Sequence, residues 1–260
     1  MSNLDPETTV GRRGLILKTL ETKGQVNVHE LSEQFKVSEV TIRNDLTQLE
    51  HKNLLIRARG GAIKTDKVTL EMKLSEKRVK NAREKEAIGR KAAKLIEEGD
   101  TIVLDSGTTT KEVANHLSRF KNLTVITNAL HIAGPLAELE QINVIMPGGT
   151  MRKKSFSLVG SIAQNNFKKF FSDKLFIGAD GIDVNLGFST PHIEEAALNR
   201  TMLRMAKKVI LVVDSSKFKR RSLAVIGQLT DIDVIVTDRG LGEDDHAKLI
   251  NAGIEVIIAD

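Results

Sequence analysis

The sequence predicts an α/β protein with two domains, a small N-terminal winged helix-turn-helix and a larger C-terminal domain built on a mainly parallel sheet. Two observations predict this division. From about residue 85 onward, short apolar runs alternate with helix-like runs, which is the pattern of a parallel sheet covered by helices. The first third instead contains short helical segments, a tight turn and a Gly-Gly pair, and it holds the whole excess of positive charge.

Charge is distributed unevenly along the 260 residues. Residues 1–90 contain 18 Lys and Arg against 13 Asp and Glu, a net charge of +5, whereas residues 91–260 contain 21 of each kind. This asymmetry favours an N-terminal part that binds a polyanion. Because there is no cysteine and no apolar run of membrane-spanning length, disulfides and thiolate metal sites are excluded, and we expect a cytoplasmic protein without a membrane partner.

Residues 1–63 are predicted to form the winged helix-turn-helix, with the helix-turn-helix motif at about 27–46 and the wing at 54–63. Apolar residues recur at helical spacing in three short segments that turn residues separate. In the third segment, Ile42 and Leu46 are one turn apart and are expected to point inward. In the wing, arginines alternate with apolar residues around a Gly-Gly turn, which predicts a β-hairpin.

The third helix is expected to enter the major groove of double-stranded DNA. Its polar residues would then face the base edges, where Arg pairs with guanine and Asn with adenine through two hydrogen bonds. The wing arginines suit phosphate contacts. A protein-interaction module with a solvated basic face is the alternative, and the coincidence of a polar helix face with a basic wing favours DNA. The predicted DNA-binding residues are Ser38, Thr41, Arg43, Asn44, Thr47, Arg57 and Arg59.

Residues 64–84 are predicted to be a linker that leads into a helix from Lys85 to Glu98, packed on the second domain. The segment from Lys64 to Arg90 is highly charged, and its few large apolar residues could not form a core of their own. A wholly flexible tether is the alternative.

Residues 85–260 are predicted to form the second domain. Ligands of parallel sheets bind beyond the carboxyl ends of the strands, where the topology switches. Glycine, hydroxyl, Asp or Asn residues follow five of the predicted strands, so a polar ligand site is expected at that edge. The predicted strands are 101–104, 123–127, 142–146, 174–178, 209–213, 233–237 and 255–258.

The loop from Asp105 to Thr110 is the strongest candidate for a ligand site. Gly107 lets the backbone turn, four hydroxyls crowd one turn, and the N–H groups of the following helix point back into it, which suits a phosphate. An ordinary helix cap is the alternative for this loop taken alone. Asp105 itself is expected to bind a sugar hydroxyl or backbone N–H groups, because it would repel a phosphate. The predicted ligand-binding residues are Asp105, Ser106, Gly107, Thr108, Thr109, Thr110, Asn128, Gly148, Gly149, Asp180 and Lys217.

Several of these segments resemble the DeoR family of bacterial transcription regulators. The resemblance is carried by NVHEL, VSEVTIRNDL and RGGA in the first domain, and by LDSGTTT, VITN, PGGT, GADGID and VDSSKF in the second. It covers about residues 10–260 and implies operator binding and an effector domain similar in fold to sugar-phosphate isomerases and CoA transferases. The implied effector is a phosphorylated sugar, and LDSGTTT and GADGID look most like the branch that controls N-acetylgalactosamine catabolism. Many members of the family have Arg where this chain has Asn44. This difference affects which operator sequence the chain is expected to bind, and not the expected fold.

Two functions are compatible with these features. The first is a DNA-binding regulator, expected to repress a sugar or amino-sugar catabolic operon and to act as a homo-oligomer, a dimer or tetramer, on repeated half-sites. The second is a sugar-phosphate isomerase or deaminase that carries a nucleic-acid-binding appendage. Candidate acid–base groups exist, but they form no catalytic motif, and the histidines lack metal-ligand spacing. We therefore expect the regulator, with no catalytic residue, metal or cofactor.

Overall fold

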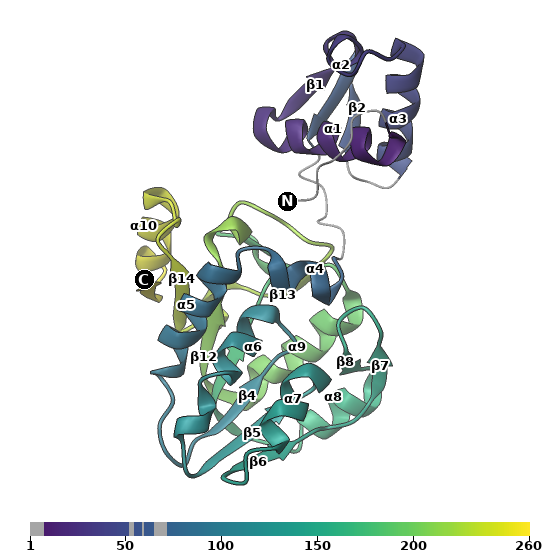
Figure 1. Cartoon of the computed structure of the whole chain (residues 1–260). Coiled ribbons are helices and arrows are strands. Elements are labelled where there is room, and N and C mark those ends of the chain that lie inside the picture. The colour runs from purple at the N-terminus through teal and green to yellow at the C-terminus, as the bar shows by residue number, and fades with distance from the viewer. Residues whose placement is uncertain (1–7, 52–54, 59, 65–71) are drawn as a thin grey trace. The chain divides into compact units, whose positions relative to one another are not determined.

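The computed structural model describes residues 8–51, 55–58, 60–64 and 72–260 of the chain. The chain divides into two compact units, which are called here the N-terminal unit, Met1–Leu70, and the sheet unit, Glu71–Asp260 (Figure 1).

The N-terminal unit has the winged helix-turn-helix architecture that the sequence predicts. Its three strands form an antiparallel sheet in the order β1-β3-β2. Ile42 and Leu46 are buried in its core together with Ile16 and Leu20. Strand β1 is not predicted from the sequence, because three residues with one buried side chain carry no periodic signal. The elements are α1 (Thr9–Lys23), β1 (Gln25–Asn27), α2 (Val28–Phe35), α3 (Glu39–His51), β2 (Leu55–Ala58) and β3 (Gly61–Lys64).

A buried carboxylate joins the first and third helices of this unit. Asp45 of α3 accepts from Arg12 Nε at 2.6 Å and from Arg13 Nε at 2.7 Å. The side chains of Asp45 and Arg12 are only 2% and 6% exposed. Because a charge at this depth needs a partner, the two helices are fixed relative to one another by this cluster.

The sheet unit is built on a seven-stranded sheet in which every neighbouring pair is parallel. Each of the seven predicted strands is a strand of this sheet, with ends that differ by at most three residues. The order is β15-β14-β12-β9-β4-β5-β6. The strands are β4 (Thr101–Leu104), β5 (Leu123–Thr127), β6 (Ile142–Ile145), β9 (Ser172–Ile177), β12 (Ala206–Val212), β14 (Val234–Asp238) and β15 (Glu255–Ala259).

Helices cover both faces of the sheet and form two hydrophobic cores (Figure 1). Alternation along each strand divides the side chains between the cores, so that Val103 lies in one and its neighbours Ile102 and Leu104 in the other. The helices on the Ile102 face are α5 (Ala82–Ala93), α6 (Thr108–Ala114) and α7 (Leu130–Ala137). Those on the Val103 face are α8 (Ser161–Phe167), α9 (Ile193–Met205) and α10 (Glu243–Asn251).

Smaller elements decorate the sheet unit and are not predicted from the sequence. They are short and partly exposed, so their side chains show no clear alternation. The strands are the hairpin β7 (Thr150–Arg152) and β8 (Ser157–Val159), and the antiparallel sheet of β10 (Gly181–Asp183), β11 (Gly187–Thr190) and β13 (Ala224–Gly227). The 3-10 turns are η1 (Leu117–Arg119), η2 (Ser215–Lys217) and η3 (Leu229–Asp231).

Part of the range 64–84, predicted as a linker, is helical. Helix α4 (Leu74–Val79) lies within it, and its Leu74 side chain is buried in the sheet unit. Strand β3 includes Lys64, and α5 begins at Ala82 instead of Lys85. A six-residue helix with one buried apolar residue has too weak a pattern to be found by periodicity.

The strand order places the topological switch between β4 and β9. The chain runs outward from β4 to β6 and then returns to add β9 on the other side of β4. Crevices at such switch points, beyond the carboxyl ends of the strands, are where open α/β sheets bind ligands. Within the described ranges, none of the helices has the length and apolar character needed to cross a bilayer.

Candidate functional site

The outer face of α3 carries the predicted DNA-binding residues. Arg43 and Asn44 are exposed, and Thr41 and Thr47 are half-buried on the same side of the helix. The side chain of Arg43 also contacts Glu39 one turn earlier, with Nη2 and Oε2 at 2.6 Å. Ser38 caps the helix, because its Oγ accepts from Thr41 N at 3.1 Å. The polar face that the sequence predicts is therefore present, and it follows a capped helix start.

The wing is braced against this helix. Arg57 of β2 donates from Nη1 to the Arg43 carbonyl oxygen at 2.9 Å and to Thr47 Oγ1 at 3.3 Å. Its backbone N–H donates to Glu50 Oε1 at 3.1 Å. Arg57 thus holds the wing on α3 in addition to any phosphate contact. Arg59, the other predicted wing residue, lies outside the described residues.

Two residues on the same helix face lie outside the predicted DNA-binding set. Val40 is 62% exposed although it is aliphatic, and Gln48 is exposed one turn after Asn44. Val40 stands three residues before Arg43, so both lie on one side of the helix. An apolar side chain outside the buried stripe of a helix can mark a DNA-contacting face, because such a side chain can contact the methyl group of thymine.

In the sheet unit, Asp105 fixes the shape of the switch point. Its Oδ1 accepts from Gly107 N at 2.8 Å and from the Thr110 hydroxyl, and its Oδ2 accepts from Gly178 N, after β9, at 2.9 Å. Burial raises the pKa of this carboxyl, and the hydrogen bonds from Thr110 and the backbone oppose that rise. The carboxylate therefore ties the loop after β4 to the loop after β9.

A pocket opens at this point, and we call it the switch-point pocket. Of the predicted ligand-binding residues, Asp105, Ser106, Gly107, Thr108, Thr109, Asp180 and Lys217 line it. Residues outside that predicted set line it too, and they come from α4, the α4–α5 corner, α5, α9, the β7–β8 turn, β11 and the loop after β12. These include Lys77, Lys80, Asn81, Lys85, Lys154, Ser155, Thr190, Glu195, Asp214 and Ser216.

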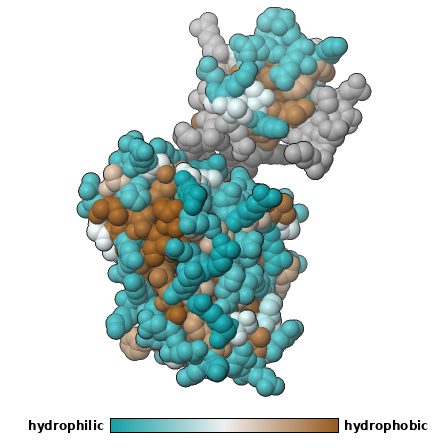
Figure 2. Space-filling model, turned by 60° about the vertical axis from the view of Figure 1, so that its left-hand side comes forward, coloured by the Kyte–Doolittle hydropathy of each residue, from teal (hydrophilic) through white to brown (hydrophobic). Residues whose placement is uncertain are grey.

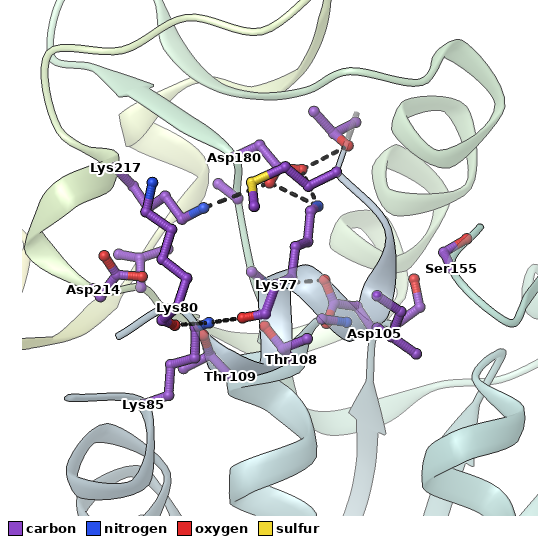
Figure 3. A pocket seen from close by; sticks show the side chains of 18 of the residues that line it. Lys77, Lys80, Lys85, Asp105, Thr108, Thr109, Ser155, Asp180, Asp214 and Lys217 are labelled. Atoms are coloured by element: carbon purple, nitrogen blue, oxygen red, sulfur yellow. Dashed lines mark hydrogen bonds and ion pairs between the residues drawn. The ribbon is translucent and has the colours of Figure 1, made fainter. Parts of the chain in front are cut away.

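Asp180 is the centre of charge in the switch-point pocket (Figure 3). Its Oδ1 lies 2.7 Å from Lys77 Nζ and 3.6 Å from Lys217 Nζ. Burial alone would raise the pKa of this carboxyl, but the two ammonium groups outweigh burial and lower it. Burial lowers the pKa of Lys217, against the opposing effect of Asp180 and Asp214. Asp180 thus lies between the amino groups of Lys77 and Lys217.

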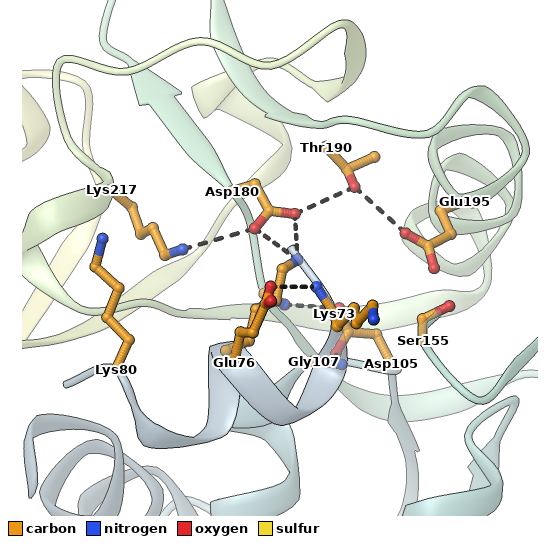
Figure 4. Close-up of polar contacts among 12 residues, drawn as sticks. Lys73, Glu76, Lys80, Asp105, Gly107, Ser155, Asp180, Thr190, Glu195 and Lys217 are labelled. Carbon is orange, nitrogen blue, oxygen red and sulfur yellow. Dashed lines mark hydrogen bonds and ion pairs between the residues drawn. The ribbon is translucent and has the colours of Figure 1, made fainter. Parts of the chain in front are cut away.

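A second polar group extends from Asp180 across the pocket (Figure 4). Thr190 Oγ1 lies 3.4 Å from Asp180 Oδ2 and 3.5 Å from Glu195 Oε2. Glu195, at the start of α9, pairs with Arg152 and accepts from Ser157 Oγ at 3.2 Å. Carboxylates and a hydroxyl are therefore available beside the lysines, an arrangement that suits a ligand with both hydroxyl groups and a negative charge.

Four predicted ligand-binding residues do not line the switch-point pocket. The Thr110 side chain is fully buried and donates to Asp105, so it supports the loop from behind. Asn128 is buried and donates to the Leu158 carbonyl at 3.0 Å, which links β5 to β8. Gly148 and Gly149 lie in the turn before β7, where a Cβ on Gly149 would stand 2.6 Å from the Val159 carbonyl oxygen. Contacts between loops involve Asn128 and Gly149, whereas Gly148 has open space beside it and a φ of 77°, which favours glycine.

Comparison with known proteins identifies the family. A model described as the DeoR C terminal sensor domain matches residues 80–239, and one described as the DeoR-like helix-turn-helix domain matches residues 12–68. The chain belongs to the DeoR family. It is 39% identical, over 96% of its length and 94% of the relative's, to a protein of Escherichia coli O157:H7 named as an aga operon transcriptional repressor. It is 35% identical to the HTH-type transcriptional regulator GlpR of Haloferax volcanii, over 95% of this chain and 96% of that one.

This DeoR-family chain is a DNA-binding transcription regulator and not an enzyme, in agreement with the first of the two functions that the sequence allows. Among solved structures, it is similar to ribose 5-phosphate isomerase A of Methanocaldococcus jannaschii, with 17% identity, a TM-score of 0.39, and 53% of this chain and 55% of that chain covered.

Proposed function

We propose that this DeoR-family regulator represses a sugar or amino-sugar catabolic operon, and that a phosphorylated sugar in the switch-point pocket controls its affinity for the operator. The observation that carries the proposal is the grouping of lysines, carboxylates and hydroxyls around Asp180, at the topological switch of the sensor domain. The name of the Escherichia coli relative, which refers to the aga operon, supports the amino-sugar branch.

DNA binding is assigned to the exposed face of α3. Arg43 and Asn44 supply the donors and acceptors for base edges, and Val40 supplies an apolar contact. Ser38, Thr41 and Thr47 are placed to contact phosphates or bases at the margins of this face. Arg57 positions the wing through its hydrogen bonds to α3.

Effector binding is assigned to the switch-point pocket. Lys77 and Lys217 supply positive charge for a phosphate, while Asp180, Glu195 and Thr190 supply partners for sugar hydroxyls or an amino group. Lysine is a usual point-charge partner of phosphate, and charge-assisted hydrogen bonds are stronger than neutral ones.

The proposed assembly is a homo-oligomer that acts on DNA in the bacterial cytoplasm. A regulator of this kind places two winged helices on two half-sites, which requires at least two copies. Strand β15 is an edge of the sheet, and Val256, Ile257 and Ile258 on it are half-exposed. Figure 2 shows an apolar area on the side of the sheet unit that comes forward in that view. Unprotected edges and apolar areas are common interfaces between copies of a chain.

The test is operator binding by fluorescence anisotropy, with DNA from upstream of the gene's own cluster and at two salt concentrations. Phosphorylated hexoses, hexosamines and N-acetylhexosamines would be added one at a time, each beside its unphosphorylated sugar. Release of specific DNA by one phosphorylated compound, and not by its parent sugar, would support the proposal. Operator binding that no compound alters would overturn the effector assignment, and absence of specific binding would overturn the repressor assignment.

A further inference from the structure

Helix α4 is the first element of the sheet unit, and residues 65–73 join it to the last strand of the winged helix. Although it precedes the sheet by many residues in the chain, it supplies lining to the switch-point pocket. Leu74, Lys77 and Lys80 all line the pocket, and Lys77 reaches Asp180 (Figure 3). A change in the position of α4 on the sheet unit therefore acts at one end of the segment that connects this unit to the winged helix.

Polar contacts with pocket residues hold α4 in place. Only Leu74 among its six residues is buried, and Val79 is 81% exposed, so little apolar area fixes the helix. A helix of this length has no stability of its own in water. Its ends are held by Leu74 N, which donates to the Lys154 carbonyl at 3.1 Å, and by Lys85 Nζ, which donates to the Lys80 carbonyl at 2.6 Å.

The middle of α4 is held by the ion pair between Lys77 and Asp180. Lys77 Nζ lies 2.7 and 2.8 Å from the two carboxylate oxygens, and the two side chains are 23% and 12% exposed. A pair this far from solvent is screened much less than a surface pair. Asn81, just beyond the helix, donates to Asp214 Oδ1 at 2.8 Å and to Ser216 Oγ at 3.1 Å, and so ties the α4–α5 corner to the loop after β12.

Ligand and α4 compete for the same groups. A phosphorylated sugar needs a cation and a hydroxyl acceptor, and Lys77 and Asp180 are here paired with one another. An effector that used either group would separate this pair, and the position of α4 would change with it. A ligand shifts an equilibrium between two conformations only through contacts that differ between them. Here the differing contact is that of Lys77, with Asp180 in one conformation and with the ligand in the other.

We propose that Lys77 is the residue through which effector occupancy reaches the DNA-binding unit. In the ligand-free protein its ammonium group closes α4 onto Asp180. In the bound protein the same group pairs with the anionic end of the effector, Asp180 accepts from an effector hydroxyl, and α4 takes a different seat. This mechanism rests on the proposed function of the switch-point pocket, and it adds the contact that couples the pocket to the segment before it.

The first experiment reports on α4 directly. The chain has no cysteine, so a single Val79→Cys variant carries one nitroxide spin label on the exposed side of the helix. We expect Lys77→Gln to alter the label's mobility in the absence of ligand, and Lys73→Gln to leave it unchanged. Lys73 is the matched control because it is an exposed lysine next to the same helix that does not line the pocket, and its capping contact with Glu76 is made by its backbone N–H, which Gln keeps. Equal spectra for Lys77→Gln and the parent would overturn the proposal, whatever the effector is.

The second experiment separates coupling from binding. Galactosamine 6-phosphate serves as the probe, its affinity for each variant is measured by calorimetry, and operator affinity is then compared without probe and at saturation. We expect the parent and Lys73→Gln to change operator affinity by about fivefold or more, as ordinary allosteric coupling does, and Lys77→Gln to lose most of that change. A full change in saturated Lys77→Gln would overturn the coupling role. If the probe fails to bind the parent, the ligand assignment fails, while the spin-label comparison still decides whether Lys77 seats α4.

Discussion

Replacing Gly107 by Ala tests whether close packing in the loop after β4 shapes the switch-point pocket. A Cβ at this position would stand 2.5 Å from Thr110 Oγ1 and 2.9 Å from Asp105 Oδ1. The backbone φ of Gly107 is −69°, which alanine adopts without strain, so the effect comes from the clash alone. Both neighbours are buried, and neither can move aside without breaking the hydrogen bond that joins them.

The expected magnitude follows from these contacts. Overpacking of a buried site typically costs about 1–3 kcal/mol. Loss of one hydrogen bond to the Asp105 carboxylate adds about 1.5–3 kcal/mol. We therefore expect the free energy of unfolding of the sheet unit to fall by about 2.5–6 kcal/mol. Effector affinity should fall as well. The loss is about tenfold for each 1.4 kcal/mol that the altered loop needs to adopt the conformation that binds the effector.

The assay is hydrogen exchange of the full chain, with local opening free energies from peptides of β4 and α6, alongside calorimetry with the effector. Gly134→Ala in α7 is the matched control, because a Cβ there meets no atom within 4 Å. It should leave effector affinity unchanged, and the usual gain in helix propensity is opposed here because a Cβ on the residue before Pro135 disfavours helical backbone. If Gly107→Ala proves as stable as the parent and binds effector equally well, close packing does not shape this loop.

Three further changes have defined outcomes. Arg43→Ala should weaken operator binding by about 1–3 kcal/mol in anisotropy titrations without altering effector affinity, because Arg43 is exposed and far in sequence from the pocket. Asp45→Asn leaves buried guanidinium groups without a counter-charge, so hydrogen exchange should show the N-terminal unit destabilised by about 3–5 kcal/mol. Burial, with the charges of Arg78 and Lys111, lowers the pKa of His131 from 6.5 to about 4. The unfolded chain therefore takes up this proton first, and the stability of the sheet unit should fall between about pH 6.5 and 4 by up to about 3 kcal/mol, a slope that His131→Gln removes in denaturant titrations.

The sequence predicts the strands of the parallel sheet well because those strands are buried on both faces. A strand such as Thr101–Leu104 is a continuous apolar run whose ends are marked by polar residues. The third helix of the winged motif is found for a different reason, since Ile42 and Leu46 repeat at helical spacing and Ser38 supplies a cap. In both cases the signal is local, and the tertiary structure agrees with it.

The sequence does not predict the far side of the switch-point pocket, because nothing local marks it. Lys77 is one of many lysines in a charged segment, and only the seating of α4 on the sheet brings it to Asp180, 103 residues later. Gly149 shows the opposite difference between sequence pattern and structure. It follows a strand and looks like ligand-loop chemistry, but its φ of 124° and its approach to Val159 give it a packing role.

Asp105 and Asp180 follow neighbouring strands, and the sequence alone cannot distinguish their roles. The oxygens of Asp105 accept from backbone N–H groups and a buried hydroxyl, partners that cannot leave without unfolding the loops. Those of Asp180 face the flexible side chains of Lys77 and Lys217, which can turn to other partners. Asp105→Asn, which would place an N–H group against a donor, should therefore destabilise the sheet unit in denaturant titrations. Asp180→Asn should instead leave the fold intact and change effector affinity in calorimetry, because only a carboxylate with exchangeable partners is available to a ligand. The reverse result would show that Asp180 holds the structure and Asp105 meets the effector.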